Sequence, residues 1–205
     1  MTTLEPRIYL ASQSPRRREL LTQIGVRFDL LLFRGNPRED AEVNEDCLPG
    51  ETPDAYVLRV AQAKARFGAD LLKRRPLVPH PVLAADTTLD VDGEIIAKPR
   101  DTADAEAILA RLSGRRHRVL TAIAMARGER IESRLSVSEV RFRTLGAEEI
   151  RRYVLTGDPM DKAGAYGIQG RAAIFVEEIR GSHSGIVGLP LCETALLLRE
   201  FGYPL

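Results

Sequence analysis

Residues 81–89 read Pro-Val-Leu-Ala-Ala-Asp-Thr-Thr-Leu, an apolar stretch with one carboxylate near its end. A short apolar run bounded by turn residues predicts a buried strand. Asp92 and Gly93 then form a hairpin signal before a second short strand over 94–96. Because an ionised carboxylate is costly to bury without a compensating partner, the sequence predicts a positive group beside Asp86. The alternative is that Asp86 begins a turn and faces water.

Strand and helix patterns alternate on both sides of this stretch. Before it we expect a strand over 8–11, a helix over 16–24 capped by Ser14, a strand over 28–33, a loop over 34–52, a helix over 53–67 and a linker over 73–79. After it we expect a helix over 102–112, antiparallel strands over 117–126 and 131–142, a helix over 147–155, a loop over 157–169, a strand over 172–179 and a helix over 191–201. This alternation predicts an α/β fold on a mixed sheet.

The composition is that of an ordinary globular protein, with 205 residues, 44% hydrophobic and 29% charged. This length suits one domain over 1–205. The longest apolar runs are too short to span a membrane and the N-terminus lacks a secretory signal, so we expect a cytoplasmic protein without a membrane partner. A net charge of +1 with interleaved signs disfavours nucleic acid as a partner. Cys47 and Cys192 are too few and too far apart for a disulfide framework or a zinc site.

Lysine is scarce in this chain. Of 30 basic residues 26 are arginine, and the lysines are Lys64, Lys73, Lys98 and Lys162. A lysine carries a compact charge on a flexible stem, which suits a phosphate that moves during a reaction. Lys73 lies in a basic run and is expected on a solvated face, whereas the other three are candidates for phosphate binding.

Two further segments could bind an anionic ligand. Residues 12–18 read Ser-Gln-Ser-Pro-Arg-Arg-Arg and join a strand to a helix N-terminus, which predicts an anion cradle. Within it, Arg17 and Arg18 are expected to lie on the exposed face of the helix. Residues 158–170 are rich in glycine, and there Lys162 suits a phosphate and Gln169 suits the edge of a nucleobase. The histidines, at positions 80, 117 and 183, lack the spacing of a zinc site and are expected to be structural.

Five segments in a fixed order extend this pattern over the chain. They read Leu-Ala-Ser-Gln-Ser-Pro-Arg-Arg-Arg-Glu-Leu-Leu over 10–21, Ala-Asp-Thr over 85–87, Ala-Lys-Pro-Arg over 97–100, Leu-Ser-Gly over 112–114 and Asp-Lys-Ala-Gly-Ala-Tyr-Gly-Ile-Gln-Gly over 161–170. Together they resemble the Maf family of nucleotide pyrophosphatases. The resemblance implies a two-lobed α/β fold on an elongated mixed sheet with a central cleft, similar to that of inosine triphosphate pyrophosphatases.

The resemblance also implies roles for individual residues. Asp86 is the implied proton acceptor, and the implied specificity positions are Arg16, Thr87 and Gln169. With the reasoning above, the expected phosphate-binding residues are Ser12, Ser14, Arg16, Lys64, Lys98 and Lys162. We expect a divalent cation, Mg²⁺ or Mn²⁺, held by Asp86 and Glu45 together with phosphate oxygens. The family's acidic position aligns with Glu45 or with Glu42, because the segment over 34–45 is longer than in many relatives.

The implied activity is hydrolysis of a nucleoside triphosphate to the monophosphate and pyrophosphate. The family branch that carries Asp-Thr after the buried strand and Tyr-Gly-Ile-Gln-Gly later is associated with dTTP and UTP, and Thr87 and Gln169 match it. Another branch, with Gln after the Asp, is associated with 7-methyl-GTP. The alternative function is that of a nucleotide-binding regulator of cell division and septum formation. The sequence leaves open whether the chain is a homodimer.

Overall fold

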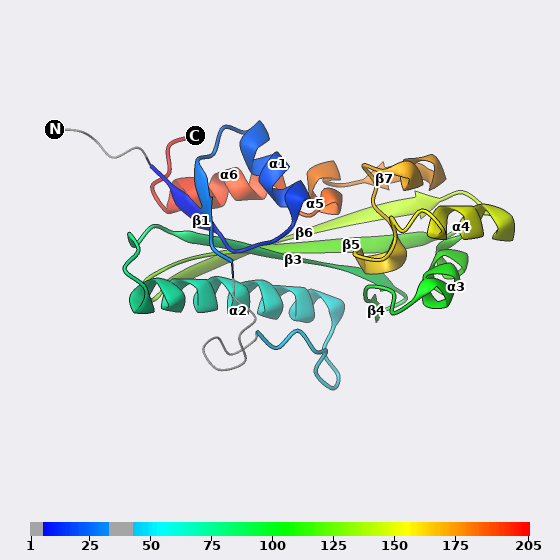
Figure 1. The fold of residues 1–205 in the computed structure, drawn as a ribbon, viewed down its shortest axis with the longest axis horizontal. Coiled ribbons are helices and arrows are strands. Elements are labelled where there is room, and N and C mark those ends of the chain that lie inside the picture. Colours follow the sequence, from blue (N-terminus) through cyan, green and yellow to red (C-terminus); the bar gives the residue numbers. More distant parts are fainter. Residues whose placement is uncertain (1–5, 33–42) are drawn as a thin grey trace.

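One mixed sheet runs through the protein in a computed structural model that describes residues 6–32 and 43–205 (Figure 1). Its strands are β1 (Ile8–Leu10), β2 (Phe28–Leu30), β3 (Val82–Val91), β4 (Glu94–Ile96), β5 (Arg116–Arg127), β6 (Arg130–Phe142) and β7 (Val176–Arg180). The order is β2-β1-β3-β5-β6-β7, with β4 paired to β3. The strands β1 and β2 and the strands β1 and β3 pair in parallel, and every other described pair is antiparallel. The predicted mixed α/β fold is confirmed.

Strand β3 has one fully paired edge and one interrupted edge. Along one side it pairs with β5 from Val82 to Asp90. On the other side β1 pairs with its first two residues and β4 with its last three. Between these partners, residues 84–88 face no strand within the described part of the chain. Asp86 therefore lies in the middle of the strand and not at its end, because the pairing with β5 continues well past it.

The helices cover both faces and one end of the sheet (Figure 1). They are α1 (Pro15–Gln23), α2 (Pro53–Arg74), α3 (Thr102–Leu112), α4 (Ala147–Val154), α5 (His183–Val187) and α6 (Leu191–Glu200), with 3₁₀ turns η1 (Ala163–Ala165) and η2 (Arg171–Phe175). Figure 1 shows α2 on one face of the sheet and α1, α5 and α6 on the other, with α3 and α4 at the far end. Three apolar clusters follow this division, one on each face beside β1 and a third beneath α3 and α4. This is the expected two-lobed arrangement.

Helix α2 is longer than the sequence pattern suggested. It continues to Arg74, so the linker predicted over 73–79 begins inside the helix. The extension is stabilised by buried residues on the sheet-facing side, among them Ala69 and Leu72. Gly68 allows the close approach, because a Cβ at this position would lie 2.7 Å from Cγ1 of Val82. None of the described helices is both long and apolar enough to cross a bilayer.

Three further local predictions need correction. Ser14 occupies the N-cap position of α1, but its side chain makes no capping hydrogen bond. The strand predicted over 172–179 begins only at Val176, because the residues before it form η2. The strand predicted over 28–33 ends at Leu30.

Candidate active site

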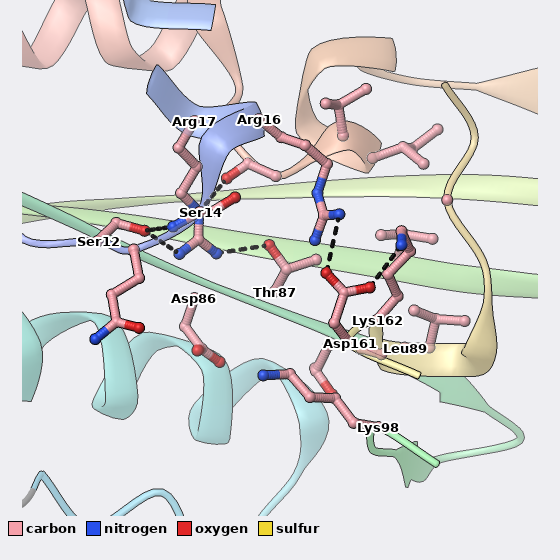
Figure 2. Close-up of a pocket in the computed structure, with 18 of the residues that line it drawn as sticks. Ser12, Ser14, Arg16, Arg17, Asp86, Thr87, Leu89, Lys98, Asp161 and Lys162 are labelled. Carbon is pink, nitrogen blue, oxygen red and sulfur yellow. Dashed lines mark hydrogen bonds and ion pairs between the residues drawn. The ribbon is translucent and has the colours of Figure 1, made fainter. Parts of the chain in front are cut away.

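A cavity of about 800 Å³ lies over the interrupted edge of β3, between the two lobes. It is lined by every residue that the sequence singled out for catalysis, phosphate, metal or specificity: Ser12, Ser14, Arg16, Glu45, Lys64, Asp86, Thr87, Lys98, Lys162 and Gln169. These residues come from the loop after β1, from α1, from α2 and the segment before it, from β3, and from the loops after β4 and α4. Figure 2 shows several of their side chains around the cavity, among them Ser12, Asp86 and Lys162. Their convergence supports a common site, although their individual roles stay predictions. Glu42, the alternative to Glu45, lies outside the described residues.

Asp86 is the buried carboxylate of the cavity, with 8% of the residue exposed. Nζ of Lys64 on α2 donates a hydrogen bond to its Oδ1 at 2.9 Å. The same ammonium lies 3.0 Å from Oε1 of Glu45. The predicted positive partner of Asp86 is therefore Lys64, and the alternative of a water-facing turn is wrong. One lysine joins the two carboxylates that the sequence proposed as a pair.

The segment that carries Glu45 is fastened to α2. The hydroxyl of Tyr56 donates to the backbone oxygen of Glu45 at 2.9 Å. Burial, together with the charge of Asp86, raises the pKa of Tyr56 to about 12, so this hydroxyl remains a donor. Arg59 donates to the backbone oxygens of residues 44 and 46 and to both carboxylate oxygens of Glu51. The hydrogen bonds from Arg59 to its carboxylate lower the pKa of Glu51 to about 2, so this carboxylate stays ionised.

Arg17 is a site residue that the sequence analysis missed. It was expected on the exposed face of α1, but its guanidinium lies in the cavity wall (Figure 2). Nε donates to the carbonyl of Gly188 at 2.8 Å, while Nη1 and Nη2 donate to hydroxyls of Ser12 and Thr87, each at 3.2 Å. Burial lowers its pKa, and the charge of Asp86 partly offsets this. Helical spacing could have found it, because Arg17 lies four residues before the buried Leu21 and so shares its face.

Ser12 is positioned as a donor to the cavity. Its hydroxyl oxygen accepts from the backbone N–H of Ser14 and from Arg17, each at 3.2 Å. A serine hydroxyl has two lone pairs and one hydrogen, so its O–H remains to donate to a ligand. The first helical bond of α1 runs from the N–H of Arg18 to the oxygen of Ser14, and the N–H groups of residues 16 and 17 precede it. This geometry suits a phosphate, as the anion cradle predicts.

The opposite wall is the loop over 158–170. Nζ of Lys162 donates to the backbone oxygen of Asp158 at 2.5 Å, to its Oδ1 at 3.1 Å and to Oδ1 of Asp161 at 2.6 Å. All three hydrogens of the ammonium thus serve its own loop. Asp161 also lies 3.5 Å from the guanidinium of Arg16, which ties the loop to α1 across the cavity. Gly167 leaves room for the lysine stem, because a Cβ there would lie 2.8 Å from Cε of Lys162.

His117 supports this loop from the core. It is 3% exposed, and its Nε2 lies 2.8 Å from the hydroxyl of Tyr166. The rings of Phe142 and Tyr166 pack edge-on against it. Burial lowers the pKa of His117 to about 4, so the imidazole is neutral. Its position in the core agrees with the structural role expected from the sequence.

The family of the chain follows from its sequence. Residues 7–201 match the family model described as Maf-like protein. The chain belongs to the Maf family. A relative in Aromatoleum aromaticum, named dTTP/UTP pyrophosphatase, is 63% identical over the full length of both chains. A relative of the same name in Dechloromonas aromatica is 58% identical, with 96% of this chain and 98% of the relative covered.

A solved structure supports the fold of this Maf protein. The structure of a HAM1 protein from Coxiella burnetii matches 95% of this chain and 99% of its own, with a TM-score of 0.51 and 21% identity. At this identity the likeness concerns the fold alone. It agrees with the two-lobed mixed-sheet architecture that the Maf resemblance implied.

Proposed function

We propose that this chain is a nucleoside triphosphate pyrophosphatase that hydrolyses dTTP and UTP to the monophosphate and pyrophosphate. The observation that carries the proposal is the cavity over β3, where two carboxylates joined by Lys64 face hydroxyl, guanidinium and helix N-terminal donors. Relatives that cover nearly the whole chain at 57–63% identity are named dTTP/UTP pyrophosphatase. The donor groups of the cavity and the names of these relatives both support hydrolysis of a nucleoside triphosphate.

The donor groups of the cavity match a triphosphate. Such a substrate brings about four negative charges, and their neutralisation supplies much of the catalysis in phosphoryl-type reactions. Arg16, the O–H of Ser12 and the first N–H groups of α1 supply donors on one side of the cavity. Lys98 points toward Asp86 from the loop after β4 (Figure 2). The triphosphate would lie between these groups, with its α-phosphate beside Asp86.

Asp86 is the proposed general base. A water molecule attacks the α-phosphorus, the new oxygen–phosphorus bond forms, and the bond to the bridging oxygen of the β-phosphate breaks to release pyrophosphate. The carboxylate of Asp86 accepts the proton of that water. Lys64 holds this carboxylate in place at 2.9 Å and supplies the positive charge that its burial requires. Catalysis by this chain's own residues then consists of positioning, charge neutralisation and one proton transfer.

The site also fits a divalent cation shared with the substrate. Asp86 and Glu45 both contact Nζ of Lys64, so their oxygens converge on one region of the cavity. Within residues 6–32 and 43–205, no group of three or more His, Cys, Asp or Glu side chains could hold a metal alone. Two carboxylates completed by phosphate oxygens and water are the donor set that Mg²⁺ prefers, and Mn²⁺ accepts similar oxygen ligands. A bound cation would polarise the α-phosphate.

The proposed specificity positions line the same cavity as the phosphate donors. Thr87 follows it on β3, and its side chain points to the opposite face of the sheet, toward α1. Gln169 in the opposite loop offers an amide that can both donate to and accept from a nucleobase edge. With Arg16, these residues form the proposed base-recognition wall.

A pyrophosphate-release assay tests the proposal. The wild-type protein is incubated with dTTP, UTP, CTP and 7-methyl-GTP, each with Mg²⁺ or Mn²⁺, and the released pyrophosphate and monophosphate are measured. We expect dTTP and UTP to be the best substrates. If every nucleotide binds but no pyrophosphate appears, the protein is a nucleotide-binding regulator and the enzymatic proposal is wrong.

A further inference from the structure

Thr121 on β5 lies directly behind the specificity position Thr87. The two residues are opposite each other in the antiparallel register of β3 and β5, and Thr121 is fully buried. Their Oγ1 atoms are 2.9 Å apart. Oγ1 of Thr121 also lies 2.7 Å from the carbonyl oxygen of Gly185, at α5. Thr121 can therefore reach a ligand only through Thr87.

The groups at the two ends of this chain of hydrogen bonds fix the position of each hydroxyl hydrogen. A carbonyl only accepts, so Thr121 must give its single hydrogen to Gly185. Thr121 then accepts from Thr87, whose single hydrogen is also used. A guanidinium only donates, so Arg17 fills one of the two lone pairs of Thr87 at 3.2 Å. What remains for the cavity is one lone pair, and Thr87 is an acceptor without a hydrogen to donate.

The hydroxyl of Ser12 has the opposite hydrogen-bonding role in the same cavity, that of a donor. The same guanidinium of Arg17 donates to it, and the N–H of Ser14 fills its second lone pair, so only its O–H remains. A phosphate oxygen, which accepts, can bond to Ser12 but not to Thr87. Conversely, Thr87 is matched to a ligand group that donates an N–H. The two hydroxyls bonded to Arg17 are thus suited to different parts of a nucleotide, Ser12 to an acceptor and Thr87 to a donor.

We infer that Thr121, through Thr87, makes the site select uracil and thymine over cytosine. This inference rests on the proposed pyrophosphatase function and adds a positioning residue to it. Uracil and thymine carry a hydrogen on N3, whereas N3 of cytosine is an acceptor. The lone pair of Thr87 accepts from the N3–H of UTP or dTTP. Against CTP, two acceptors face each other and both lose their contact with water, which disfavours binding.

The test compares kcat/KM for UTP and CTP in the wild type and in Thr121→Val. Valine keeps the shape but removes the acceptor for the Thr87 hydrogen, so the Thr87 hydroxyl can turn and donate to N3 of cytosine. We expect the UTP-to-CTP ratio to fall about tenfold, with kcat/KM for CTP rising. Damage to folding alone would lower both values. Thr121→Ser keeps the hydroxyl and should keep the wild-type ratio.

A matched control is Thr194→Val. Thr194 is also fully buried and donates to a backbone carbonyl at 2.7 Å, that of Pro190, but it lies on α6 and is not among the residues that line the cavity. Its removal should leave the ratio unchanged. If Thr121→Val does not fold, Thr87→Val supplies the test, because loss of the acceptor should lower kcat/KM for UTP more than for CTP.

Two results would overturn the inference. One is an unchanged UTP-to-CTP ratio in folded Thr121→Val, which would assign base selection to other residues such as Gln169. The other is an equal loss of UTP and CTP turnover in Thr87→Val. Failure of the underlying function looks different, because the wild-type protein would then release no pyrophosphate from UTP or dTTP.

Discussion

Acidification should destabilise the fold through His117. The imidazole is buried against Phe142 and Tyr166, and its Nδ1 has no hydrogen-bond partner among the described residues. Burial lowers its pKa to about 4, whereas an unfolded chain holds it near the ordinary 6.5. Between these pH values the unfolded chain binds the extra proton and the folded protein does not. The stability that neutral His117 contributes is therefore complete above pH 6.5 and is lost as the pH falls toward 4.

The expected size of this effect follows from the two pKa values. At pH 5 the solution is about 1.5 pH units below the ordinary pKa of 6.5 that the imidazole has in the unfolded chain. Protonation of His117 therefore favours the unfolded chain by about 2 kcal/mol at this pH. Urea unfolding of the wild type and of His117→Gln at pH 7 and pH 5 measures it. Glutamine can keep a hydrogen bond to Tyr166 but does not titrate. Between pH 7 and pH 5 the free energy of unfolding of His117→Gln should therefore fall by about 2 kcal/mol less than that of the wild type. An equal loss in both proteins would refute this reasoning.

Three further changes test other parts of the structure. Gly164→Ala should lower the free energy of unfolding by about 2 kcal/mol or more, because the backbone φ is +72° and the new Cβ would lie 2.1 Å from Leu89; thermal unfolding tests this, and an unchanged Tm would contradict it. Arg17→Lys should lower kcat/KM for dTTP by about 100-fold, because lysine lacks the planar fork that positions two hydroxyls and a carbonyl; wild-type kinetics would contradict the assignment. Arg59→Ala should raise the Mn²⁺ concentration that gives half-maximal activity, because it removes the hydrogen bonds that hold the segment carrying Glu45. A metal titration measures this concentration, and an unchanged midpoint would show that Arg59 does not position Glu45.

Local patterns predicted much of the fold. The helix over 102–112 and the strand pair on either side of residues 127–130 were found because capping residues, apolar spacing and the turn all lie within one short stretch. The length of α2 was underestimated because its last turns are stabilised by packing on the sheet. That packing depends on Gly68 meeting Val82, a contact that sequence spacing does not contain.

The sequence predicted those parts of the site where the chemistry of one residue requires a particular partner. A carboxylate in an apolar strand needs a cation, and Lys64 meets that need. Arg17 was missed because its partners lie far away in the sequence: Thr87 is 70 residues distant and Gly188 is 171. The hydrogen positions at Thr87 and Thr121 depend in turn on Gly185, which only the tertiary structure brings to them.

The most direct test of the central claim is the turnover of dTTP by Asp86→Asn. Asparagine keeps the size of the side chain but cannot accept the proton from the attacking water. The proposed role predicts that kcat falls by about 1,000-fold while thermal unfolding shows an intact fold. Asp70→Asn, on the exposed side of α2, is the matched control and should retain turnover. An Asp86→Asn protein that releases pyrophosphate from dTTP at the wild-type rate would contradict the account.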